Sequence, residues 1–240
     1  NCTSNRVQTL AECGWDAWIK YYRPNENSNN STISYYTKGS IIAMLLDLEI
    51  MQSTNGQKSM NDVLRFLYDE YYKKLQRGFT DAEMQQAVER IAGKSLDAFF
   101  KNHIYDTQKP NYNQYLGYAG LRLAEYVQNA QTAFLGASTS MQGGRLVINS
   151  VQRGTPAYEQ GLNVNDEIIA VDGYRVGDDF AQFMGRKKAG EKAAFTVSRA
   201  GILQTLEITF GSNPNISYRI ERLPNATAQQ QELLRKWLRF

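Results

Sequence analysis

The hydrophobic period of this 240-residue chain changes near Tyr115. Before this point apolar side chains recur at the spacing of helices, and after it they alternate in short runs that are typical of strands. Each half is long enough to bury a core of its own. The sequence therefore predicts an α+β chain of two domains, with a helical domain at 1–114, a β-rich domain at 115–212 and a C-terminal tail with a short helix at 213–240.

Breaks in the pattern divide the first part of the helical half. A first helix is predicted at 7–22, before a proline that ends it, and a polar loop rich in Asn and Ser follows at 25–32. After an extended lead-in at 33–36, a strongly apolar helix is predicted at 38–51. Because this helix is apolar on most faces, we expect it to be central.

Three further helices are predicted from their capping residues. A Ser or Thr with an acid three residues later forms a capping box, in which both side chains accept from free helix N–H groups. The two boxes are Ser59 with Asp62 and Thr80 with Glu83. Gly93 is expected to end the second of these helices, and Ser95 to cap a third.

Short apolar runs separated by turns predict the strands of the second half. The runs lie at 146–148, 167–171, 194–197 and 206–210. Asp172-Gly173 predicts a tight hairpin turn, and Ala200-Gly201 a second turn. One helix is predicted between the strands, at 178–188, and another ends the tail, at 228–238.

Two motifs in the β-rich half carry a family resemblance. Residues 154–162 are Gly-Thr-Pro-Ala-Tyr-Glu-Gln-Gly-Leu, and residues 165–173 are Asn-Asp-Glu-Ile-Ile-Ala-Val-Asp-Gly. This combination resembles PDZ domains of the bacterial, protease-associated type, with Thr155 in place of a serine and Asn165 in place of a glycine. The resemblance implies a PDZ-like β-barrel or β-sandwich that binds peptide or protein C-termini by adding them as a strand to an open sheet edge.

The PDZ resemblance also implies which residues would bind a peptide. The matching carboxylate-binding loop is 134–137, where Gly136 lets the backbone turn its amides toward an anion. Leu135 and Ala137 are expected to line the side-chain pocket of the ligand. Candidate groove-wall residues on the 178–188 helix are Phe180, Phe183 and Met184. The alternative is that these apolar side chains are ordinary core residues and that the domain is only a brace.

The helical half carries a second resemblance, centred on residues 35–39, Tyr-Tyr-Thr-Lys-Gly. With 15–24, 46–48 and 59–63, this segment is similar to the glycyl aminopeptidase family of zinc metallopeptidases, in which a PDZ domain also follows the catalytic domain. The resemblance implies the α-helical C-terminal part of a thermolysin-like catalytic domain. It further implies that Tyr36, with Tyr35 as the alternative, donates to the oxyanion of the hydrolytic reaction.

The metal ligands of that family have no counterpart in this sequence. His103 is the single histidine, and there is no His-Glu-x-x-His motif. One histidine without partners at ligand spacing makes no zinc site. We therefore expect no metal ligand, no cofactor and no peptidase activity in this chain alone. The family's zinc would be held by the N-terminal part of the same enzyme, before residue 1, and that part is an expected partner beside the peptide C-termini.

Charge and hydropathy exclude other partner classes. The 27 basic and 24 acidic residues give a net charge of +3 without a basic stripe, which argues against a nucleic-acid partner. The longest apolar run, at 41–46, is far shorter than the roughly 20 residues of a membrane span. Cys2 and Cys13 are expected to be free thiols. Exported members of the aminopeptidase family favour a periplasmic location, and the alternative function is a stand-alone PDZ peptide-binding scaffold.

Overall fold

The computed structural model describes residues 3–127, 131–212 and 216–239, which form two compact units. The helical unit contains Gln8–Ala17, Ile33–Ala124 and the C-terminal segment from Tyr218. The β unit contains Trp18–Thr32 and Glu125–Ser217, together with the start of the chain up to Val7. Each unit is therefore built from segments that lie far apart in the sequence.

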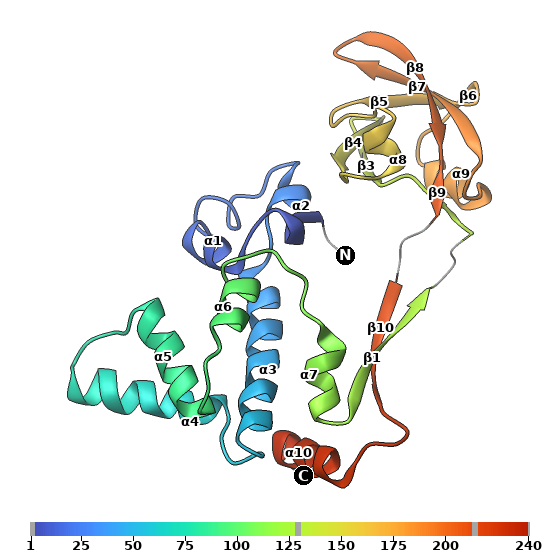
Figure 1. Cartoon of the computed structure of the whole chain (residues 1–240). Helices are drawn as coiled ribbons and strands as arrows, with labels where there is room; N and C mark the ends of the chain where they lie inside the picture. Colours follow the sequence, from blue (N-terminus) through green and yellow to red (C-terminus); the bar gives the residue numbers. More distant parts are fainter. Residues whose placement is uncertain (1–2, 128–130, 213–215, 240) are drawn as a thin grey trace. The chain divides into compact units, whose positions relative to one another are not determined.

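Helix α3 (Tyr35–Ser53) is the centre of the helical unit (Figure 1). It packs against α1, α4, α5, α7 and α10. The bounds of these and the other helices of the unit are Leu10–Trp15 for α1, Met60–Leu67 for α4, Asp81–Ala92 for α5, Asp97–His103 for α6, Tyr112–Tyr118 for α7 and Ala228–Leu238 for α10. A π-helix, η2 (Tyr68–Lys74), continues α4. The predicted central helix and the predicted tail helix are both confirmed.

The core of the helical unit surrounds α3. Leu45, Leu48 and Ile50 of this helix are fully buried. Helix α10, at the other end of the sequence, adds Leu233 and Leu234 to the same core. The last helix of the chain is therefore an integral part of the unit that the first helices begin.

The predicted capping boxes are present. Ser59 with Asp62 starts α4, and Thr80 with Glu83 starts α5, which ends at Gly93 in the left-handed conformation, with φ of 71°. Glu83 also binds Arg77 at 2.6 Å, and this guanidinium lowers the pKa of Glu83 to about 2. The prediction for Ser95 is one residue early: Leu96 is the N-cap of α6, although the Ser95 hydroxyl accepts from the Asp97 amide at 3.3 Å.

The predictions for the first 36 residues are partly wrong. The expected helix at 7–22 is only α1 (Leu10–Trp15), after a 3₁₀ turn η1 (Thr3–Arg6), because a capping box of Thr9 with Glu12 starts it late. The Asp16 carboxylate, which accepts from Gln8 Nε2 at 3.0 Å, lies at its C-cap.

The loop and the lead-in that were expected before the central helix are also partly helical. The expected polar loop contains a short helix, α2 (Ser28–Ser31). Helix α3 begins at Tyr35 and not at residue 38, because the Ser34 hydroxyl accepts from the Thr37 amide at 3.2 Å. Tyr35 and Tyr36 therefore lie in the first turn of the helix.

An antiparallel sheet with the order β3-β4-β5-β7-β8 forms the β unit, and β6 also pairs with β5. The strand bounds are Ala137–Gln142 for β3, Arg145–Val151 for β4, Glu167–Val171 for β5, Tyr174–Arg175 for β6, Lys192–Arg199 for β7 and Ile202–Thr209 for β8. Two short helices, α8 (Pro156–Glu159) and α9 (Phe180–Arg186), and a small pair, β2 (Ala133–Phe134) with β9 (Gly211–Ser212), complete it.

Both predicted hairpin turns are confirmed. Asp172 and Gly173 have φ of 52° and 79°, and Ala200 and Gly201 have φ of 50° and 84°. Positive φ at both central residues is the geometry of the turn that matches the twist of paired strands. Asn165 has φ of 68° at the position where the PDZ pattern has glycine, and asparagine tolerates this conformation better than other side chains.

The segment before α10 contains a strand that the sequence analysis did not predict. Strand β10 (Ile216–Arg222) pairs with β1 (Leu121–Val127), almost a hundred residues earlier. Arg122 and Glu221 join the two strands in an ion pair at 2.8 Å. The chain passes from the helical unit to the β unit within β1 and returns within β10.

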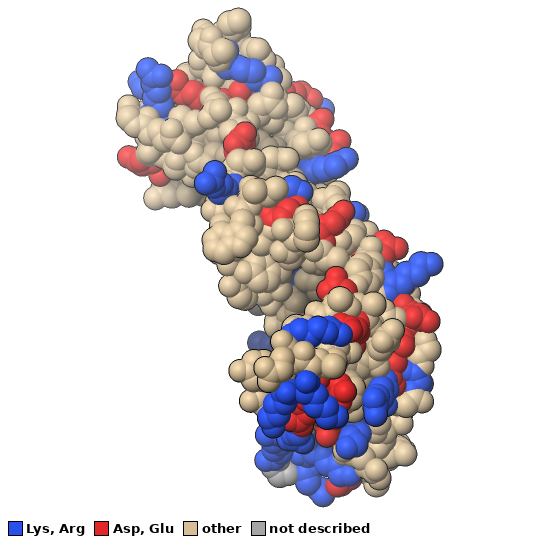
Figure 2. Space-filling model, turned by 90° about the vertical axis from the view of Figure 1, so that its left-hand side faces the viewer, with Lys and Arg blue, Asp and Glu red and all other residues tan. Residues whose placement is uncertain are grey.

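Charged side chains of both signs are interspersed over the face shown in Figure 2. Within η2, ion pairs join Lys73 to Asp69 at 2.9 Å and Lys74 to Glu70 at 2.6 Å. Among the residues that the structure describes, no helix is long and apolar enough to cross a membrane.

Candidate peptide-binding and catalytic residues

The loop between β2 and β3 requires a glycine at position 136. Gly136 has φ of 82°, and a Cβ built on it would lie 2.1 Å from Thr155 Oγ1 and 2.2 Å from Thr155 Cβ. Thr155 is held in this place because its hydroxyl donates to the Gln152 carbonyl at 2.6 Å. The Gly-Thr-Pro-Ala motif therefore packs directly against the predicted carboxylate-binding loop.

Two hydrogen bonds set the direction of the peptide groups in this loop. The Leu135 carbonyl accepts from the Ala157 amide at 2.8 Å, and the Gly136 carbonyl accepts from the Gln152 amide at 2.8 Å. In a planar trans peptide the C=O of one residue and the N–H of the next point in opposite directions. The N–H groups of Gly136 and Ala137 therefore point away from these partners, as an anion-binding loop needs.

Strand β3, which follows the loop, is an edge strand. It pairs with β4 on one side and is the end member of the described sheet order. An edge strand presents unpaired N–H and C=O groups that can pair with another chain. Its hydroxyl side chains Ser138 and Ser140 bind Ser150 at 2.6 Å and Asn149 at 3.1 Å, both on β4, which holds the strand in register.

The predicted peptide-binding side chains all belong to one apolar cluster in the β unit. Leu135 and Phe180 are buried, with 5% and 8% of their surface exposed. Ala137, Phe183 and Met184 are partly buried and pack against the same core. These three are the accessible members of the predicted set, whereas Leu135 and Phe180 also serve the domain's own core.

Tyr36 lies in the first turn of α3 with 60% of its surface exposed. Its ring packs against that of Tyr35, with centroids 4.2 Å apart. Lys38, two residues further, is partly buried, and burial lowers its pKa. Among the described residues no three His, Cys, Asp or Glu side chains lie close enough to hold a metal ion. The Cys13 thiol lies 2.7 Å from the Ile33 carbonyl, while Cys2 falls outside the described residues.

Exposed aromatic residues near the start of the chain are a feature that the sequence analysis missed. Trp15 in the helical unit is 92% exposed, and in the β unit Trp18 and Ile19 are 78% and 72% exposed. The sequence pattern places them on the apolar face of one helix over 7–22, but α1 ends at Trp15, and Trp18 and Ile19 lie beyond it. Tryptophan is enriched among the residues that dominate protein–protein contacts.

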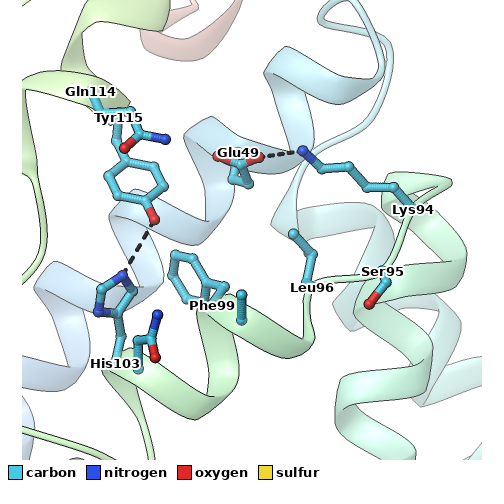
Figure 3. A pocket seen from close by; sticks show the side chains of 10 residues that line it. Glu49, Lys94, Ser95, Leu96, Phe99, His103, Gln114 and Tyr115 are labelled. Atoms are coloured by element: carbon cyan, nitrogen blue, oxygen red, sulfur yellow. Dashed lines mark hydrogen bonds and ion pairs between the residues drawn. The ribbon is translucent and has the colours of Figure 1, made fainter. Parts of the chain in front are cut away.

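A small pocket in the helical unit was also not predicted (Figure 3). Its volume is about 240 Å³, and Glu49, Lys94, Phe99, His103 and Tyr115 are among its lining residues. Glu49 is buried and ion-paired with Lys94, and His103 Nε2 lies 3.3 Å from the Tyr115 hydroxyl. Burial, reinforced by the Glu49 carboxylate, raises the pKa of Tyr115 to about 12, and burial lowers the pKa of His103. The uncharged pair of His103 and Tyr115 lies beside the ion pair of Glu49 and Lys94, an arrangement that suits a structural role.

Two protein families match separate parts of the chain. The M61 glycyl aminopeptidase family matches residues 1–42, and the PDZ domain family matches residues 133–210. The chain joins M61 glycyl aminopeptidase sequence to a PDZ domain. Both predicted family resemblances are thereby confirmed, and the M61 match includes Tyr36 and the exposed aromatic residues.

Known proteins of similar sequence or structure are longer than this chain. An aminopeptidase N family protein from Idiomarina loihiensis superposes with a TM-score of 0.80 at 24% identity, over 98% of this chain and 41% of its own. This likeness confirms the predicted α+β architecture. Carboxy-terminal processing protease CtpA from Bacillus subtilis is 25% identical over 170 residues, which are 68% of this chain and 35% of that protein. The chain spans less than half the length of either.

Proposed function

We propose that this chain is the C-terminal portion of a zinc aminopeptidase that releases small N-terminal residues, glycine or alanine, and that its PDZ domain binds peptide or protein C-termini. The observation that carries the proposal is the M61 match at residues 1–42, the same stretch that exposes Trp15, Trp18 and Tyr36. A zinc-bearing N-terminal part of the enzyme would cover the exposed Trp15 and Tyr36 of the helical unit.

The zinc site of such an enzyme does not fit the residues of this chain, which has one histidine and no described metal cluster. No catalytic step is therefore assigned to zinc here. The part that this chain would contribute is the Tyr36 hydroxyl, which donates to the carbonyl oxygen of the scissile peptide as negative charge develops on it. A preplaced donor of this kind contributes about 3 kcal/mol to lowering the barrier.

The catalytic half of the proposal is tested by zinc analysis and kinetics. The purified chain should contain no stoichiometric zinc and should not hydrolyse glycine p-nitroanilide. In the enzyme extended at its N-terminus to include a His-Glu-x-x-His segment, Tyr36→Phe should lower kcat about 100-fold and leave the zinc content unchanged. Tyr35→Phe is the matched control, because the two rings are neighbours. Stoichiometric zinc in the chain alone, or full activity of the Tyr36→Phe variant, would refute this assignment.

The peptide-binding half is tested with C-terminal peptides. The exposed edge of β3 and the N–H groups of the Gly136 loop should bind a peptide with a free terminal carboxylate. Fluorescence anisotropy should show saturable binding of such a peptide and none of its C-terminal amide. Equal affinity for the two forms would show that the terminal carboxylate is not recognised.

A further inference from the structure

A basic run at the end of α9 lies beside the strand that leads into the carboxylate-binding loop. The run is Arg186-Lys187-Lys188. The Lys187 carbonyl accepts from the Ala133 amide at 3.2 Å, and Lys188 forms a β-bridge with Thr132. Because the loop begins directly after β2 (Ala133–Phe134), these contacts fix the C-terminal end of α9 next to the loop.

The charges in this run are not equivalent. Lys187 binds Asp172 at 2.8 Å and lies over the Phe183 ring at 5.1 Å, so its charge is largely compensated. Arg186 and Lys188 are exposed, and within the described part of the chain neither has an ion-pair partner. Two positive charges are therefore available to a ligand on this side of the loop.

The opposite end of α9 carries the opposite charge. Asp178 and Asp179 are exposed just before the helix, and Asp179 accepts from the Gly177 amide at 3.0 Å. At about 1.5 Å per residue, the helix separates the acidic end from the basic end by about 10 Å. Strand β3 (Ala137–Gln142) itself has no charged side chain.

We propose that the PDZ domain selects peptides with acidic side chains just before the terminal carboxylate. The inference rests on the proposed peptide binding at β3. An extended peptide advances about 3.3 Å per residue, so with its carboxylate at Gly136 its last three residues stay within about 10 Å of the loop. Arg186 and Lys188 stand at the end of α9 that is held against β2, next to this loop, and each attraction across water at a separation near 7 Å corresponds to about threefold in affinity.

The test uses two labelled pentapeptides that differ only in the two residues before a C-terminal leucine, both glutamate in one and both lysine in the other. On the whole chain at low ionic strength, the glutamate peptide should bind at least tenfold more tightly, because each basic residue attracts this peptide and repels the lysine peptide, and the difference should shrink at high salt. Because the two introduced carboxylates attract the lysine peptide, Arg186→Glu with Lys188→Glu should reverse the preference. A matched control with the same change in net charge is Lys101→Glu with Lys236→Glu, which lies in the helical unit and should retain it.

The outcomes separate the two proposals. Equal affinity of the two free-carboxylate peptides, or a preference that high salt and the Arg186 and Lys188 reversals leave unchanged, would overturn the charge selectivity while keeping PDZ peptide binding. Failure of both peptides to bind would overturn both. The salt dependence of the unsubstituted chain gives a second readout that does not depend on how well the variants fold.

Discussion

Gly136→Ala tests whether the carboxylate-binding loop is confined by Thr155. A non-glycine residue at φ of 82° costs about 1–2 kcal/mol. The added Cβ would also lie 2.1–2.6 Å from three side-chain atoms of Thr155, so one of the two must move. Overpacking of this kind costs about 1–3 kcal/mol. The β unit should therefore lose about 2–5 kcal/mol of unfolding free energy.

Gly201→Ala is the matched control for backbone strain. Gly201 has φ of 84°, close to that of Gly136, but no atom lies within 4 Å of its built Cβ. It should cost only the conformational part, about 1–2 kcal/mol. The difference between the two variants, about 1–3 kcal/mol, isolates the contact with Thr155.

Hydrogen exchange measured by mass spectrometry over a series of urea concentrations resolves the two units. Amides of β5 (Glu167–Val171) and β7 (Lys192–Arg199) report the opening of the β unit, while amides of α3 serve as an internal reference. If Gly136→Ala destabilises β5 and β7 no more than Gly201→Ala does, Thr155 does not confine the loop and the reasoning fails.

Three further predictions concern polar contacts. Asn30→Asp keeps the acceptor that lies 2.9 Å from the Arg153 amide, but it loses the side-chain donor that lies 2.8 Å from the Val151 carbonyl. Urea unfolding should therefore show that the β unit loses about 3 kcal/mol of unfolding free energy. The same change at an exposed position, Asn25→Asp, should have little effect. The pKa of Glu83 is lowered from 4.5 to about 2, so its carboxylate stabilises α5 fully above about pH 4.5 and loses this effect as the pH falls to 2. The difference in unfolding free energy between the unsubstituted chain and Glu83→Gln should therefore vanish over that range when unfolding is measured against pH. A difference that persists at pH 2 would contradict this prediction. Trp237→Phe removes a hydrogen bond of 3.0 Å to Asp47 and should lower the helical unit's stability by about 2 kcal/mol, as thermal unfolding followed at 222 nm will show; an unchanged transition would mean that this bond contributes nothing.

Local signals predicted the elements whose causes are local. The box of Thr80 with Glu83 and the Asp172-Gly173 turn each act within four residues, and both appear as expected. Thr9 with Glu12 is a signal of the same kind, and it marks the start of α1 within the longer apolar pattern at 7–22. At this position the capping box predicts the helix start better than the hydrophobic period does.

The missed features depend on partners that are distant in the sequence. Strand β10 (Ile216–Arg222) exists because β1 is available to pair with it, and a seven-residue segment cannot reveal that partner. Likewise, Gly136 was predicted for its conformational freedom, whereas the close approach of Thr155, nineteen residues later, gives an additional reason for it. The exposure of Trp15 and Trp18 depends on what surrounds them, which composition and periodicity do not specify.

The pairing of β1 with β10 determines the order in which the chain can fold while it is being synthesised. The β unit is complete once Ser217 has been made, but the helical unit still lacks Leu233 and Leu234. The core of the helical unit therefore stays incomplete while the β unit, which lies between its segments in the sequence, is synthesised and folds. Truncated chains that lack α10 should contain a folded β unit and a helical unit with an incomplete core. Proteases should therefore cleave such chains first within the helical unit.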